Sequence, residues 1–311
     1  MNFNDEQQEE NSAYIQLLRL TCYAIAGIVA GTVLSVLVLV LLYGTTGLSS
    51  NYSNLSEGNE QFLMVIRITQ VLTTGFLFIL PPVWLARSQE IKFTDFYGFK
   101  KPQASLLFMV FLLMAFSSPM MEWIAVCNQK MVLPGFLKSV ENWMRVKEDA
   151  AMKMTILLLK IDHFGDFLIN LFIVALLPAI GEELIFRGAI QRSFTKMYKR
   201  PHIAIWITAF IFSAIHMQFF GFFPRLLLGA AFGYIYWWTG SLWYAMFAHF
   251  LNNAFAVCQA WYFQLHHIPL EQVDNSSHFP WYGYIISLIL SIFLFNYLKK
   301  QTTRHNGKQL G

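Results

Sequence analysis

Long uncharged hydrophobic runs make up most of this chain, and short polar segments separate them. A run of about 20 predominantly apolar residues is the length that an α-helix needs to cross the hydrocarbon core of a bilayer. About eight such runs are present, so we predict an all-α, polytopic membrane helix bundle. Thr239-Gly240-Ser241 is the only break between the sixth run, which is short, and the seventh. The predicted helices are residues 17–43, 62–85, 104–126, 167–190, 202–220, 224–239, 242–262 and 281–298.

The composition agrees with a membrane protein. Of the 311 residues, 56% are hydrophobic and only 13% are charged, whereas a soluble domain has roughly 25% charged residues. The net charge of +4 arises from basic residues in short loops, which is not the pattern of a nucleic-acid-binding protein. Cys22, Cys127 and Cys258 have neither metal-ligand nor disulfide spacing, so we interpret them as core or lipid-facing residues.

The distribution of Lys and Arg predicts the orientation, because cytoplasmic loops carry an excess of these residues. Loops 86–103 and 191–201 each contain four basic residues, and the tail 299–308 contains four more. Loops 44–61 and 263–280 contain none. Eight crossings with both termini in the cytoplasm satisfy this distribution. We therefore predict an integral, multi-pass protein of the cytoplasmic membrane of a bacterium.

We divide the chain into four segments. A polar tail (1–16) precedes an N-terminal transmembrane region (17–163), a core (164–262), and a last segment with a loop, the final helix and a basic tail (263–311). The first run lacks the basic start of a signal peptide and is long enough to span a bilayer, so we interpret it as a retained anchor. No internal repeat is visible.

Residues 127–163 depart from the charge rule, because they hold six basic residues yet would face outside. They also hold four acidic residues, so the segment is mixed in charge. Its apolar residues recur at helical spacing, which predicts an amphipathic helix around 135–155 on the outer leaflet. A solvated helix packed on the bundle is the alternative. The apolar residues are Phe136, Leu137, Val140, Trp143 and Met144.

Three charged side chains follow fourteen uncharged residues in the fourth predicted helix. They are Glu182, Glu183 and Arg187. Inserting a central Asp, Lys or Arg costs roughly 2.5–3.5 kcal/mol, which indicates either a buried ion-pair network or chemistry. Residues four apart share a helix face, so we expect Glu183 to pair with Arg187. Glu182 is rotated by about 100° from Glu183 and is left for another partner.

Two histidines and an asparagine in other predicted helices complete a candidate site. His216 ends the sequence Phe212-Ser213-Ala214-Ile215-His216, and His249 and Asn253 lie one turn apart. We predict that Glu182 and His216 activate a water molecule, and that His249 and Asn253 donate hydrogen bonds to the oxyanion. At about 1.5 Å per residue, Glu182 and His249 lie at similar depth, whereas His216 lies roughly 7 Å to the other side of the bilayer midpoint.

The same residues also allow a structural role, a zinc site or a serine or cysteine nucleophile. A Glu–Arg pair four apart is more often structural, and His or Asn commonly joins membrane helices by hydrogen bonds. Two imidazoles and a carboxylate also bind zinc, but the His-Glu-x-x-His helix is absent. We therefore predict no cofactor and leave zinc open. Ser213 lacks an Asp partner, and Cys258 lies nine residues beyond His249, so neither is favoured as a nucleophile.

In this order the motifs resemble those of the CPBP family of intramembrane proteases, also called the CAAX protease or Abi family, to which the Ras-converting CAAX endopeptidase of eukaryotes belongs. The resemblance covers about residues 165–255. It implies a glutamate-type endopeptidase with the roles assigned above, supported by Glu183 and Arg187, and it carries an older metalloprotease label. The motifs read Glu182-Glu183-x-x-x-Arg187, Phe212-x-x-x-His216 and His249-x-x-x-Asn253.

The leading hypothesis is thus an intramembrane endopeptidase that hydrolyses a peptide bond in a membrane-associated or lipidated substrate. Its expected partners are membrane lipids and the peptide or protein substrate, and no nucleic acid. The alternative is a non-catalytic membrane scaffold, chaperone or bacteriocin-immunity factor of the same fold. A small-molecule transporter would require inverted repeats or broken helices, and the sequence shows no repeat.

Overall fold

The computed structural model describes residues 11–53, 60–270 and 279–307. These residues form helices and connecting turns, with no β-strand among them. Six helices in the described ranges are long and apolar enough to cross a membrane. The predicted fold class, a polytopic helical bundle, is confirmed. The six spans are Ala13–Gly44, Gln61–Ser88, Ala104–Gln129, Phe164–Tyr198, Phe219–Thr239 and Trp281–Thr302.

The helices follow one another with short connections. Segments η1, η3 and η4 have π-helical hydrogen bonding, and η2 and η5 are 3-10 turns. In chain order the elements are α1 (Ala13–Ser53), α2 (Glu60–Thr74), η1 (Gly75–Ile79), α3 (Leu80–Ser88), α4 (Phe93–Phe96), α5 (Ala104–Gln129), η2 (Gly135–Leu137), α6 (Lys138–Leu158), α7 (Phe164–Asn170), η3 (Leu171–Leu176), α8 (Leu177–Glu183), η4 (Leu184–Gln191), α9 (Arg192–Tyr198), α10 (Pro201–Ala214), η5 (Phe219–Gly221), α11 (Phe222–Thr239), α12 (Leu242–Leu265) and α14 (Trp281–Gly307).

A helix is present within each of the eight predicted ranges, with different bounds. The break at Thr239-Gly240-Ser241 is confirmed, because Gly240 adopts a left-handed conformation (φ 63°) at the C-terminus of α11. Helix α12 is not among the six apolar spans, which agrees with the polar His249 and Asn253 on it. Helix α1 begins before residue 17, and α14 continues beyond residue 298. Most of the predicted polar tail, residues 1–10, lies outside the described residues, as do 54–59, 271–278 and 308–311.

The prediction of one helix over 202–220 was wrong. Helix α10 ends at Ala214, and His216 lies in a turn that precedes a left-handed residue, Met217 (φ 54°). Beyond this turn, backbone groups form hydrogen bonds with side chains that are not their neighbours in a helix. The Phe220 N–H donates to Glu148, and the Ser213 hydroxyl donates to the carbonyl of Phe222. The helix ends because these tertiary partners replace its own hydrogen bonds.

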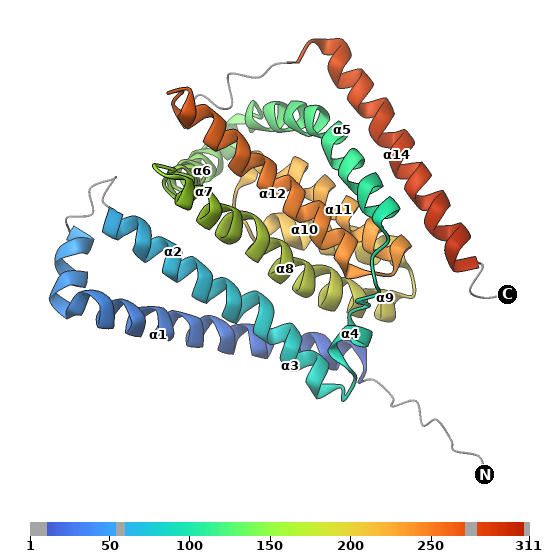
Figure 1. Ribbon diagram of the computed structural model, residues 1–311, viewed down its shortest axis with the longest axis horizontal. Helices are drawn as coiled ribbons and strands as arrows, with labels where there is room; N and C mark the ends of the chain where they lie inside the picture. The colour runs from blue at the N-terminus through green and yellow to red at the C-terminus, as the bar shows by residue number, and fades with distance from the viewer. Residues whose placement is uncertain (1–10, 54–59, 271–278, 308–311) are drawn as a thin grey trace.

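The arrangement of the ends agrees with an even number of crossings. Figure 1 shows the start of α1 and the end of α14 on the same side of the picture, where α3, α4 and α9 also lie. Helix α6 and the start of α7 lie toward the opposite end. The two basic loops, 86–103 and 191–201, therefore share an end with both ends of the described chain. Which end faces the cytoplasm stays a prediction.

Helices α10, α11 and α12 form the middle of the bundle. The α1–α2 hairpin lies along one side of it, and α14 packs on α5 at another side (Figure 1). One core cluster joins α3, η4 and the start of α12, and a second joins α5, α11, α12 and α14. The buried faces of α11 and α12 thus meet η4 and α8, which carry the charged motif.

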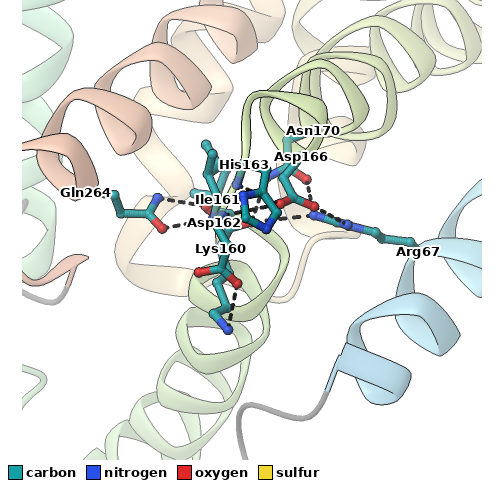
Figure 2. Close-up of polar contacts among 9 residues, drawn as sticks. Arg67, Lys160, Ile161, Asp162, His163, Asp166, Asn170 and Gln264 are labelled. Atoms are coloured by element: carbon teal, nitrogen blue, oxygen red, sulfur yellow. Dashed lines mark hydrogen bonds and ion pairs between the residues drawn. The ribbon is translucent and has the colours of Figure 1, made fainter.

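A polar cluster fixes α2 to α7 and to the loop that precedes it (Figure 2). Arg67 on α2 is buried and pairs with Asp166 at 2.9 Å. Its second terminal nitrogen donates to Asn170 Oδ1 at 3.2 Å and to the carbonyl of Lys160 at 3.4 Å. Gln264 on α12 accepts the Ile161 N–H and donates to the carbonyl of Leu159. We call these residues the Arg67 cluster: Arg67, Lys160, Asp166, Asn170 and Gln264.

Helix α6 confirms the helix predicted around 135–155, with bounds of Lys138–Leu158. It packs on the segment that follows His216. Trp143 lies 5.3 Å from the Phe219 ring, and the Arg145 guanidinium lies 4.4 Å over the Phe220 ring. Its Glu141 is buried and pairs with Arg145 at 2.9 Å. Its location on the outer leaflet stays a prediction.

Candidate active site

The core of the site is a buried ion pair between α8 and η4. Arg187 donates to Glu183 Oε1 at 2.6 Å, and neither side chain is exposed to solvent. The second terminal nitrogen of Arg187 donates to the carbonyl of Gly229 on α11 at 3.0 Å. The predicted Glu183–Arg187 pair is confirmed. One charged pair therefore joins the fourth predicted helix to α11 in the bundle interior.

Aromatic rings surround this cation. The Arg187 guanidinium lies 4.5 Å from the centroid of Phe212 and 5.4 Å from that of Phe232. Cation–π contacts of this kind become stronger where water is excluded. Gly229 permits the approach of α11, because a Cβ there would lie 3.1 Å from the Phe212 ring.

His249 on α12 joins both carboxylates of the motif. Its Nδ1 lies 2.8 Å from Glu183 Oε1, and its Nε2 lies 3.9 Å from Glu182 Oε2. Because a carboxylate accepts hydrogen bonds, the geometry requires the proton on Nδ1. The ring also stacks on Phe232 at 5.3 Å. The sequence predicted similar depth for His249 and Glu182 and left Glu182 for a partner other than Arg187. In the structure the short contact of His249 is with Glu183 instead. Glu183 therefore contacts both Arg187 and His249.

Glu182 differs from its neighbour in environment. Its side chain retains 15% exposure, and its one ionic contact among the described residues is the 3.9 Å approach to His249. The predicted separation of the two carboxylates is therefore confirmed. Glu183 is fully buried and hydrogen-bonded, and Glu182 keeps oxygens available for another group.

His216 lies beside the other site residues without bonding to them. Its Nδ1 is 2.7 Å from the carbonyl of Phe212, and its ring is 5.1 Å from the Phe212 ring. A carbonyl can only accept, so Nδ1 carries the proton, and in the neutral form of the ring Nε2 presents a lone pair. The Phe212 ring lies 6.0 Å from that of His249. Within the described residues, no hydrogen bond or ion pair joins His216 to Glu182.

Asn253 faces the fourth predicted helix, as His249 does one turn earlier. Its Nδ2 donates to the carbonyl of Val174 in η3 at 3.1 Å, and its Oδ1 accepts from Asn252. The expected shared face of His249 and Asn253 is confirmed. An amide nitrogen has two hydrogens, so a second N–H is available beyond the bond to Val174.

The acidic and imidazole groups do not form a metal site in the described part of the chain. No group of three or more His, Cys, Asp or Glu side chains there is arranged to hold a metal ion. The residues present thus do not fit a zinc centre, and no step of the chemistry below is assigned to one. All three cysteines are exposed on the protein surface, which agrees with the lipid-facing interpretation.

Two arginines that the structure places in polar contacts were given no role in the sequence analysis. Arg67 is the one charge in the predicted helix 62–85, and this isolated charge was the signal for a buried partner. Arg225 is the one charge in the predicted helix 224–239, and from the first turn of α11 it donates to Gln218 Oε1 at 2.7 Å. Its charge acts on Glu182 and on Glu148, so it belongs to the surroundings of the site.

Comparison with known proteins identifies this region. Residues 164–255 match the family model described as type II CAAX prenyl endopeptidase Rce1-like. Over these residues the core of this chain is similar to that family. The match includes every motif residue from Glu182 to Asn253, so the resemblance inferred from the three motifs is confirmed for this core. Together with the six apolar helices, the match indicates an integral membrane protein.

A curated relative is also similar to part of this chain. The "Uncharacterized protein YpbD" of Bacillus subtilis (strain 168) is 32% identical over 113 residues, which is 35% of this chain and 51% of that protein. This chain thus spans about half the length of the relative. No solved structure gives a significant match to the chain. The family match therefore concerns residues 164–255, and the N-terminal helices lie outside that match.

Proposed function

We propose that this protein is an intramembrane endopeptidase that hydrolyses a peptide bond of a membrane-associated or lipidated substrate. The observation that carries the proposal is the unequal use of the two adjacent carboxylates. Glu183 is buried between Arg187 and His249, whereas Glu182 remains partly exposed beside the same histidine. A purely structural ion-pair network does not need the second carboxylate.

Glu182 and His216 act on the water. The Glu182 carboxylate or the His216 Nε2 lone pair accepts a proton from water, and the resulting hydroxide attacks the carbonyl carbon of the scissile bond. The C–N bond then breaks, and the same proton passes to the leaving amine. The products are a carboxylic acid and an amine. Glu183 fixes the His249 ring through Nδ1, which directs Nε2 toward the reacting groups.

His249 and Asn253 stabilise the negative oxygen that forms during attack. An N–H on His249 Nε2 requires the doubly protonated ring, whose charge Glu182 and Glu183 balance. The second amide hydrogen of Asn253 supplies the other donor. Loss of one oxyanion donor typically lowers the rate about 10²–10³-fold. The expected location is a bacterial cytoplasmic membrane, with lipids and a peptide or protein substrate as partners and no resident cofactor.

The test is cleavage by the purified protein in proteoliposomes. The substrates are a fluorogenic membrane-peptide library and a farnesylated peptide ending in Cys-a-a-X, the prenylated sequence for which the matched family is named. We expect cleavage that is lost in Glu182→Ala and His216→Ala while both variants keep the wild-type circular dichroism spectrum. Full activity of Glu182→Ala would show the mechanism to be wrong. A chelator arm reports any metal requirement. Absence of cleavage of every substrate would favour a scaffold of the same fold.

A further inference from the structure

Arg225 is the second cation beside the candidate active site, and its environment differs from that of Arg187. Arg187 is fully buried and ion-paired, whereas Arg225 is only partly buried. Its partners are neutral, namely the side-chain and main-chain oxygens of Gln218 at 2.7 and 3.5 Å. Among the described residues no carboxylate lies within ion-pair distance of Arg225. A guanidinium held by neutral acceptors keeps its charge available for an incoming anion.

The position of Arg225 on α11 directs it toward the site. Gly229 accepts the hydrogen bond of Arg187, and Phe232 stacks on His249. Arg225 precedes these residues by four and seven positions, so it shares their helix face. It lies about 6 Å along the axis from Gly229. The turn that carries His216 connects α10 to this end of α11.

The loop before α11 is shaped around the guanidinium. A Cβ on Gly221 would lie 3.2 Å from a terminal nitrogen of Arg225, so glycine gives the head group its space. The loop is itself held from outside, because Glu148 on α6 accepts the Phe220 N–H at 3.2 Å. The cation is therefore pre-positioned by the fold before any substrate arrives.

We infer that Arg225 binds the free carboxylate at the end of the substrate peptide and thereby sets the position of the cut, an inference that rests on the proposed endopeptidase function. A guanidinium binds a carboxylate through two parallel hydrogen bonds. A Cys-a-a-X sequence ends at the C-terminus, so a bond cut within it lies at most three residues from that carboxylate. Three extended residues span roughly 10 Å. The cut bond and the carboxylate that Arg225 binds would therefore lie within about 10 Å of each other.

The test compares a farnesylated Cys-a-a-X peptide with the same peptide amidated at its C-terminus, in phosphatidylcholine proteoliposomes. Wild type should prefer the acid by roughly 10- to 150-fold in kcat/KM. Arg225→Gln should lose this preference through a higher KM for the acid alone, whereas any effect of the lost charge on Glu182 should change kcat equally for both peptides. Arg225→Lys should restore part of the preference. An equal loss for both peptides would assign Arg225 a merely structural role and overturn the inference.

A binding arm separates this inference from the proposed function. Labelled acid and amide peptides are titrated into Glu182→Gln protein with and without Arg225→Gln, where no cleavage is needed. Weaker binding of the acid alone supports the carboxylate site even if wild type cleaves neither peptide. Equal binding of both peptides by the Glu182→Gln protein overturns it. Loss of the acid preference on adding phosphatidylglycerol also overturns it, because the cation would then be a headgroup site.

Discussion

Removal of the Glu183 carboxylate tests the ion-pair centre most directly. In Glu183→Ala, Arg187 keeps its bond to the Gly229 carbonyl and its aromatic neighbours but becomes a buried cation without a counter-charge. Breaking a buried pair by removing one partner costs about 3–5 kcal/mol. The folded-to-unfolded ratio should fall roughly 10²- to 4 × 10³-fold. His249 loses its Nδ1 acceptor in the same variant.

The matched control is Glu182→Ala, which changes the same residue type one position earlier. Glu182 is partly exposed, and its contact with His249 is 3.9 Å long. Its loss should cost less than about 1 kcal/mol, as for other weak ion pairs. The free energy of unfolding is measured by denaturant titration in detergent micelles, followed by circular dichroism. A cost below 1 kcal/mol for Glu183→Ala would refute the assignment of Glu183 as the buried counter-ion.

A double-mutant cycle compares Glu183→Leu, Arg187→Met and the variant that carries both changes. Glu183→Leu combined with Arg187→Met replaces the pair by apolar groups, a change that is often neutral or stabilising. We expect the double variant to recover most of the loss of Glu183→Ala. We also expect activity to stay lost, because His249 is no longer fixed through Nδ1. Strict additivity of the two single changes would contradict the pairing.

Three further predictions follow from the packing and the charges. Arg67→Met should lower the free energy of unfolding by about 1.5–3 kcal/mol, because the charge-assisted bonds to Asp166 and its neighbours are lost. Gly188→Ala should destabilise the protein by about 1–3 kcal/mol, because the new Cβ would lie 2.6 Å from the buried ring of Tyr97. Burial raises the pKa of Glu148 above its usual 4.5, although the Phe220 N–H and Arg225 act to lower it. Stability relative to Glu148→Gln should therefore decline as the pH rises from 4.5 through this raised pKa, and level off above it.

Each of these predictions has its own control. Gly165→Ala adds a methyl group where no atom lies within 4 Å, so its stability should match or slightly exceed wild type; equal losses at both glycines would contradict the packing argument. Asp149→Asn changes the exposed neighbour of Glu148 and should leave most of the pH dependence in place. Wild-type stability of Arg67→Met would show that the Arg67 cluster does not hold α2. All are read by the same denaturant titration.

The bundle could be predicted because length and hydrophobicity act locally. Each run of apolar residues had to be helical to satisfy its own backbone groups in the membrane, and Gly240 marked the break between α11 and α12. The end of α10 could not be predicted in this way. Residues 215–219 contain neither glycine nor proline, and the turn depends on Glu148, 72 positions earlier in the chain.

For the site, too, local contacts could be predicted from the sequence and contacts between helices could not. The Glu183–Arg187 pair follows from four-residue spacing within one helix, so the sequence was sufficient. The choice of His249 between two adjacent carboxylates depends on how α12 rotates against α8, and that rotation is set by packing among several helices. The partners of Arg67 likewise come from α7 and the loop before it, 93 to 103 positions away in the chain. The only sign of such contacts in the sequence is a single charged residue, Arg67, in an apolar run.

The π-helical hydrogen bonding of η4 gives the charged motif a further property. A π-helical segment bonds each residue to the fifth along the chain, whereas an α-helix uses the fourth, so the stretch holds more residues than an α-helix of equal rise. If the same residues formed a regular α-helix, the side chains after this segment would be turned by about 100° relative to Glu183. Gln191 would then lose the Gly233 carbonyl that it now contacts at 3.0 Å. One continuous helix thus contacts α12 through Glu183 and α11 through Gln191. The extra residue of the π-helical segment allows both contacts to form at the same time.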